Sequence, residues 1–110
     1  MAAPANQRKA MLTDEVWAAL LEQSALEGQS ASALCEHVLR HYLNLPDDEK
    51  PPVLITGVAQ TAVQRTIYIE KTLWAAAKGR KVMERRSISA ILEQQLRAYM
   101  GLDMPESKEI

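Results

Sequence analysis

Two short stretches of the chain alternate apolar and polar residues, and helical patterns follow each of them. The stretches are QRKAML at residues 7–12 and QRTIYI at residues 64–69. Successive strand residues point to opposite faces of a strand. On one face the last positions of each stretch are apolar, and the other face is free to contact another molecule. A lone strand of this length is unstable in water, so each copy needs a strand partner and a helical layer. The natural partner of each strand is the other copy.

A capped helix of about 14 residues is predicted after the first strand. Thr13 is a favourable N-cap, and Asp14 and Glu15 place negative charge in the first turn, where it interacts favourably with the helix dipole. Gly28 is positioned to end this helix in a left-handed conformation. The residues expected to face inward are Val16, Ala19, Leu20 and Leu26, with Trp17 on the flank.

Ser30 is the predicted cap of a second helix, which Asn44 and Pro46 close. Its apolar positions recur at the i, i+3, i+4 spacing of an amphipathic helix. The residues of this inward face are Ala31, Leu34, Cys35, Val38, Leu39 and Tyr42.

The same order recurs in the second half of the chain. An offset of 57 residues aligns 39 positions without a gap, of which 14 are identical, and this indicates a duplicated unit. The second unit is predicted to contain a strand at 64–69, a helix at about 71–84, a cap at Ser87 and a helix to residue 100, closed by Gly101. Its second helix is expected to bury Ile88, Ile91, Leu92, Leu96 and Tyr99. Arg80 and Lys81 lie near the inward face of its first helix, where they either snorkel or mark a looser contact.

The segment between the units begins with PDDEKPP, which favours a linker. The predicted organisation is therefore a first unit at 7–45, a linker at 46–63, a second unit at 64–102 and a tail at 103–110. The apolar residues at 53–55 are expected to form either a short strand or an apolar latch.

Charge is distributed unequally between the two units, although the formal net charge of the chain is only −1. Residues 7–45 carry three Lys/Arg and five Asp/Glu, a balance of −2, whereas residues 64–102 carry eight Lys/Arg and three Asp/Glu, a balance of +5. The linker and tail mask this basic second unit. The absence of a long apolar run or signal-peptide core, and a single cysteine, predict a cytoplasmic protein without a membrane segment or a disulfide.

The strand, capped helix, Ser-x-Ser turn and second helix ending in an aromatic resemble the ribbon-helix-helix family of DNA-binding proteins, to which the Arc and MetJ repressors belong. The resemblance covers both units. It implies a mainly α fold with a short β ribbon, in which two tandem ribbon-helix-helix units form a pseudo-dimer within one chain. The family inserts its ribbon into the major groove of DNA.

The resemblance implies two sets of DNA contacts. The residues expected to contact bases from the ribbon are Gln7, Lys9, Met11, Gln64, Thr66 and Tyr68. The residues expected to contact phosphates at the starts of the second helices are Ser30, Ser32, Arg85, Arg86, Ser87 and Ser89. Since the two strands differ, the DNA site is expected to be asymmetric. Arg85 replaces the usual glycine, which is costly if this position has a positive φ.

Other residues favour simpler interpretations. His37 and His41 are spaced i, i+4, but no acidic or cysteine ligand shares that face, so no metal site is expected. Cys35 is expected to be a core residue, and Trp17 and Trp74 are expected to pack rather than to bind a ligand. No catalytic set or phosphate-binding glycine loop is present, so we expect neither an enzyme nor a cofactor.

The predicted function is sequence-specific binding of double-stranded DNA, as a transcriptional repressor or a plasmid or phage accessory factor. The alternative is a protein-interaction module, such as an antitoxin or a scaffold, that keeps the fold with little DNA binding. The units either pair within one chain or exchange between chains, and pseudo-dimers could associate on adjacent half-sites. A small-molecule effector is not expected.

Overall fold

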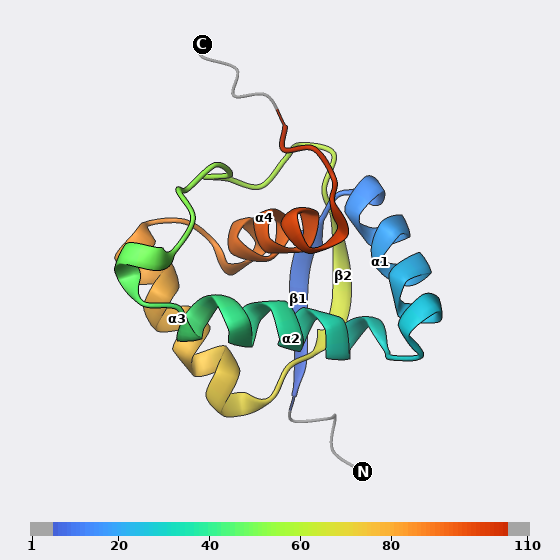
Figure 1. Ribbon diagram of the computed structural model, residues 1–110, viewed down its shortest axis with the longest axis horizontal. Coiled ribbons are helices and arrows are strands. Elements are labelled where there is room, and N and C mark those ends of the chain that lie inside the picture. The colour runs from blue at the N-terminus through green and yellow to red at the C-terminus, as the bar shows by residue number, and fades with distance from the viewer. Residues whose placement is uncertain (1–5, 106–110) are drawn as a thin grey trace.

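Residues 6–105 fold into four α-helices, one short 3₁₀ helix and a two-stranded antiparallel sheet (Figure 1). The computed structural model describes residues 6–105, so residues 106–110 of the predicted tail lie outside the described part. In chain order the elements are β1 (Gln7–Leu12), α1 (Asp14–Glu27), α2 (Ala31–Asn44), the short 3₁₀ helix η1 (Asp47–Glu49), β2 (Val63–Tyr68), α3 (Lys71–Glu84) and α4 (Ile88–Met100).

The two strands pair with each other, as the repeat predicts. Lys9 lies opposite Thr66 in an antiparallel register, and the pairs extend from Gln7 with Tyr68 to Leu12 with Val63. β2 therefore begins and ends one residue earlier than predicted. The backbone N–H of Ile69 nevertheless donates to the carbonyl of Asn6 at 2.9 Å, which continues the pairing past the end of the strand.

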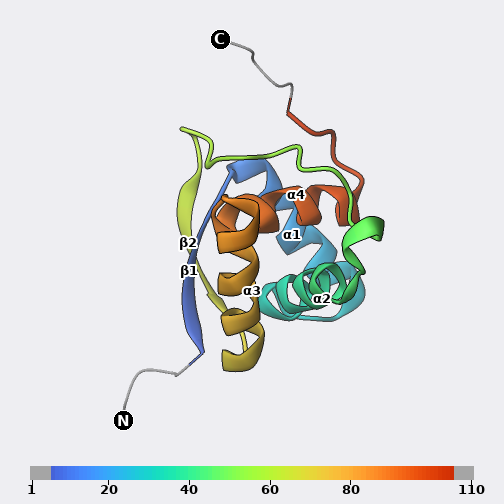
Figure 2. The same ribbon diagram turned by 90° about the vertical axis from the view of Figure 1, so that its left-hand side faces the viewer.

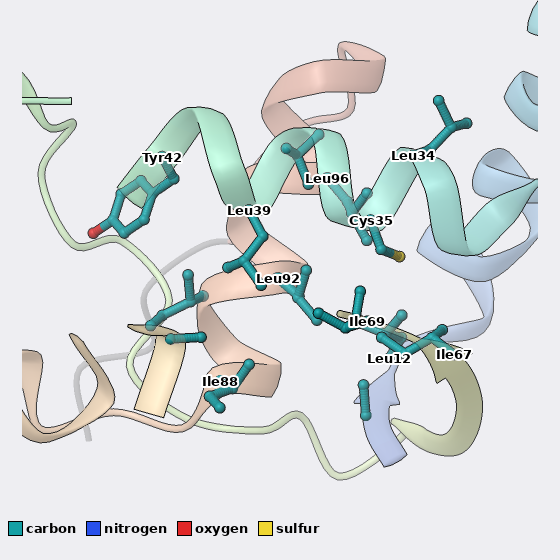
Figure 3. Close-up of a cluster of buried hydrophobic side chains, with 14 of the residues drawn as sticks. Leu12, Leu34, Cys35, Leu39, Tyr42, Ile67, Ile69, Ile88, Leu92 and Leu96 are labelled. Atoms are coloured by element: carbon teal, nitrogen blue, oxygen red, sulfur yellow. The ribbon is translucent and has the colours of Figure 1, made fainter. Parts of the chain in front are cut away.

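All four helices lie on one face of this ribbon (Figure 2). The side chains on that face are almost completely buried, namely Ala10, Leu12, Ile67 and Ile69. Figure 3 shows three of them beside Leu92 of α4. Burying a Leu or Ile side chain is worth about 1.5–3 kcal/mol, so this face fixes the ribbon on the helices.

The first helix of each unit begins at a side-chain cap. The hydroxyl of Thr13 accepts from the N–H of Val16, and the carboxylate of Glu70 accepts from the N–H of Leu73. The prediction that Leu26 faces inward is wrong, because its side chain is 75% exposed. At 100° per residue it lies about 240° around the helix from the buried Leu20, away from the inward stripe.

The second helices carry most of the core. The predicted inward face of α2 is confirmed, except that Ala31 is only partly buried. In α4 the predicted apolar residues are buried, except for Tyr99, whose hydroxyl reaches Glu27. Four polar residues of α4 are buried as well, so this helix is enclosed on nearly every side: Glu93, Gln94, Gln95 and Arg97.

The linker encloses α4 because it packs against it as a latch, one of its two predicted forms. Ile55 is buried, and the N–H groups of Leu54 and Ile55 both donate to the side-chain oxygen of Gln94, at 2.9 and 3.0 Å. The amide nitrogen of Gln94 donates to the carbonyl of Pro52 at 2.8 Å. One buried glutamine thus satisfies three backbone groups of the linker, and residues 53–55 form no strand.

The structure also bears on the predictions for Cys35 and for a membrane-spanning segment. Cys35 is buried in the core, as predicted, and burial raises the pKa of its thiol to about 12, which keeps it neutral. Among residues 6–105, no helix combines the length and apolar character needed to cross a membrane.

The repeat provides a matched pair of positions for testing backbone strain. Arg85 ends α3 with φ of +56°, and Gly28 ends α1 with φ of +66° at the equivalent position. A side chain is disfavoured in this left-handed region by about 1 kcal/mol or more. We therefore expect Arg85→Gly to raise the free energy of unfolding by about 1 kcal/mol and Gly28→Arg to lower it by a similar amount. Urea unfolding of both variants checks this, and equal shifts in one direction would contradict it.

Candidate nucleic-acid interface

The outer face of the ribbon carries the side chains that the sequence predicts to contact bases. Five of them are exposed: Gln7, Lys9, Gln64, Thr66 and Tyr68. The ammonium of Lys9 donates to the hydroxyl of Thr66 at 2.7 Å, across the two strands. Because the helices lie on the opposite face, none of them covers these residues (Figure 2).

Met11 differs from the other predicted base contacts because it is half-buried. It lines a hollow of about 500 Å³ beneath the linker, beside Ser89 and Glu93. The thioether is thus partly engaged with the protein at the end of the ribbon.

The serines of the two Ser-x-Ser turns divide into two roles. Ser30 and Ser87 cap α2 and α4, accepting from the N–H groups of Ala33 and Ala90. The second serines instead hold the ribbon: Ser32 accepts from the N–H of Tyr68 at 2.9 Å, and Ser89 accepts from the N–H of Met11 at 2.8 Å. The starts of α2 and α4 are therefore tied to opposite strands.

Sequence reasoning missed the role of the strand arginines. The guanidinium of Arg8 lies 5.5 Å from the ring centroid of Trp74, and that of Arg65 lies 5.3 Å from the ring centroid of Trp17. Each cation–π contact joins one unit to the other. The signal was present in the sequence, since both residue pairs are identical at the 57-residue offset, and the predicted packing role of the tryptophans is confirmed.

The two arginines before Ser87 have opposite environments. The expectation that Arg86 contacts a phosphate requires a correction. Arg85 is exposed at the helix end, so its guanidinium is accessible to a phosphate. The side chain of Arg86 is 0% exposed and donates to the carboxylate of Glu84 at 2.7 Å and to the carbonyl of Ile55 at 2.9 Å. Arg86 therefore belongs to the core, where it fixes the linker.

Glu84 is the common acceptor of this buried network. Burial acts to raise the pKa of its carboxyl, but hydrogen bonds from Tyr42, Arg80 and Arg86 outweigh burial, so the net pKa is lowered below 4.5. The Tyr42 hydroxyl lies 2.5 Å from the carboxylate. Arg80 also reaches Asp47 of η1 at 2.9 Å, which explains how this charged residue is accommodated beside the core.

The two histidines of α2 lie at its exposed face. The ring of His37 packs edge-on against Tyr99 with centroids 5.5 Å apart, and both histidines border a hollow of about 240 Å³ that Gln95 also lines. Within residues 6–105, no group of three His, Cys, Asp or Glu side chains is arranged to hold a metal ion.

The buried network predicts an acid-dependent loss of stability. Since the pKa of Glu84 is lowered on folding, its contribution is present above about pH 4.5 and is lost as the pH falls through the lower folded value. We expect Glu84→Gln to cost about 2–3 kcal/mol of unfolding free energy at pH 7 and much less at pH 3. Urea unfolding at both pH values measures this.

The first unit supplies the control. Glu27 occupies the equivalent position, and its pKa is also lowered, chiefly by the hydrogen bond from Tyr99, but it is fully exposed. Glu27→Gln should therefore change stability little at either pH. An equal loss in both variants would show that burial is not the cause.

Comparisons with protein-family models, with curated proteins and with solved structures found no match to this chain.

Proposed function

We propose that this chain binds double-stranded DNA by inserting the β1–β2 ribbon into the major groove, with its two units acting as a ribbon-helix-helix pseudo-dimer. Repression of transcription by occlusion of a promoter is the regulatory outcome that fits such binding. The proposal rests on how the ribbon divides its side chains between its two faces.

The inner face of the ribbon carries four buried apolar residues, Ala10, Leu12, Ile67 and Ile69, and five of the six outward side chains are exposed. Buried residues on β1 and β2 anchor the ribbon to the helices, so the outer side chains project from a fixed platform. The major groove is wide enough for a two-stranded ribbon, and its base edges present hydrogen-bond donors and acceptors. This uncovered polar face is the single observation that carries the proposal.

The strand register favours an asymmetric site. It pairs the outward residues across the ribbon as Gln7 with Tyr68, Lys9 with Thr66 and Met11 with Gln64. Every pair joins different residue types, so the two halves offer different contacts to DNA. Lys suits the guanine acceptors, Gln suits adenine, and Tyr or Met can contact a thymine methyl.

The helix starts beside the ribbon provide positions for backbone contacts. α2 and α4 each begin at a serine cap and are held to a strand by the serine two residues after that cap. Free N–H groups and the positive end of the helix dipole favour a phosphate at such positions. Arg85 adds an exposed cation beside the start of α4.

Selection from a pool of random duplexes at low salt tests the proposal. The expected result is an asymmetric motif that is no longer than the stretch of major groove that one ribbon contacts. Recovery of no motif, together with co-purification of a stoichiometric protein partner, would instead favour an interaction module.

The ribbon residues are expected to determine sequence preference. Lys9→Ala and Thr66→Ala should each relax the preference at a base position, by about tenfold in affinity ratio. Competition binding against single-base variants of the selected site measures this. Asn44→Ala, at the exposed end of α2 away from the ribbon, is the control and should leave every ratio unchanged. Unaltered ratios in both ribbon variants would contradict base contact by the ribbon.

Arg85 is expected to act on all sequences alike. Arg85→Gly should weaken binding to every duplex and reduce the slope of log affinity against log salt by about one. Because the same change is expected to stabilise the fold, weaker binding cannot be attributed to unfolding. A change of preferred sequence, with no change in slope, would assign Arg85 to base recognition instead.

A further inference from the structure

A basic hollow borders the β1 edge of the ribbon. It has a volume of about 560 Å³ and runs between β1, α3 and the start of α4. We call it the lysine trough and define it by Lys9, Trp74, Lys78, Lys81 and Ser87, which line it together with Val82, Ile88 and Ser89. Sequence reasoning missed two of its lysines, since it treated α3 only as a packing helix.

The three lysines that line the trough lack acidic partners, and the ammonium of Lys9 donates to the hydroxyl of Thr66. Within residues 6–105, no carboxylate lies within 4.0 Å of Lys9, Lys78 or Lys81, although seven ion pairs form elsewhere in that range. Trp74 is itself covered by the guanidinium of Arg8, which brings a fourth positive charge close. Cations gathered without counter-charges produce a positive potential that attracts an anion.

At the other edge of the ribbon, the matching arginine, Arg65, is paired with Asp14 at 2.5 Å, and the lysines are missing. At the 57-residue offset, the positions of Lys9, Lys78 and Lys81 are occupied by Thr66, Leu21 and Ser24. Gly28 likewise stands at the position of Arg85. The duplicated architecture therefore presents the same surface twice, once basic and once neutral.

We propose that the lysine trough holds the phosphodiester backbone that borders the major groove beside β1, so that DNA is held mainly by one of its two backbones. This inference rests on the proposed DNA binding and adds to it which of the two DNA backbones the protein mainly contacts. The base edges are read along the whole ribbon, whereas the phosphate contacts concentrate on the β1 side.

The position of the trough favours DNA over an acidic protein as the occupant. Lys9 belongs to both surfaces, because its side chain stands on the outer face of the ribbon and also lines the trough. When a ribbon lies in the major groove, the two backbones run along its edges. A backbone at the β1 edge would therefore meet Lys78, Lys81 and Arg85 without any change of the fold.

A double variant tests the trough. Lys78→Ala/Lys81→Ala should reduce the salt slope by about two and weaken binding at 0.1 M salt by at least about tenfold, with the selected motif unchanged. Ethylation interference on the selected site should show contacted phosphates mainly on one border of the groove in the unaltered chain. These contacts should be lost in the variant.

The neutral edge provides the matched gain-of-function variant. Leu21→Lys/Ser24→Lys places two lysines at the equivalent positions, of which Leu21 is exposed and Ser24 is partly buried. It should raise the salt slope by about two and add interference on the second border. If the unaltered chain selects a motif but the alanine variant keeps its affinity and slope, the trough assignment fails while DNA binding stands. If the unaltered chain binds no duplex, both proposals fail.

Discussion

The pairing of β1 with β2 is the constraint on which the other contacts between the two units depend. The strands belong to segments 57 residues apart, and closing that separation costs entropy that only buried contacts can offset. Pairing brings Arg8 onto Trp74 and Arg65 onto Trp17, and it places the strand N–H groups against serines of the opposite helices. Backbone hydrogen bonds, cation–π contacts and apolar burial thus all enforce one register.

The duplicated units are not equivalent, because the linker covers only one of them. It returns across α4 and satisfies its own backbone through Gln94, while the equivalent position in α2 is the exposed His37. Gln94 can be buried at this place because its own side-chain oxygen and nitrogen are both hydrogen-bonded. Arg86 and Glu84 form a buried network beside the covered helix, with Arg86 donating to Gln94, whereas α2 keeps a solvent-exposed face.

Some of the positive charges in the second unit are buried and stabilise the fold, and others remain exposed on the surface. Arg86 is enclosed and neutralised by Glu84, while Arg85, its neighbour, remains exposed in a strained conformation. Strain of this kind persists only where the surrounding structure enforces it or where the side chain has a use. A glycine would fit this backbone better, and the side chain that stands there instead is the cation proposed above to contact a phosphate.

The sequence by itself determined the secondary structure, the repeat and the partner of each strand, because these follow from local propensity, periodicity and the 57-residue offset. Caps at Thr13, Ser30 and Ser87 and the strained end at Arg85 were readable for the same reason. Only the tertiary structure decided that Arg86 is buried, since two of its partners, Ile55 and Tyr42, are distant in the chain. It also decided which edge of the ribbon is basic. The lysines of α3, in the second unit, come to lie beside β1, in the first unit, only when the two units pack together. Burial and charge clustering are properties of packed surfaces, and a linear pattern does not specify which surfaces meet.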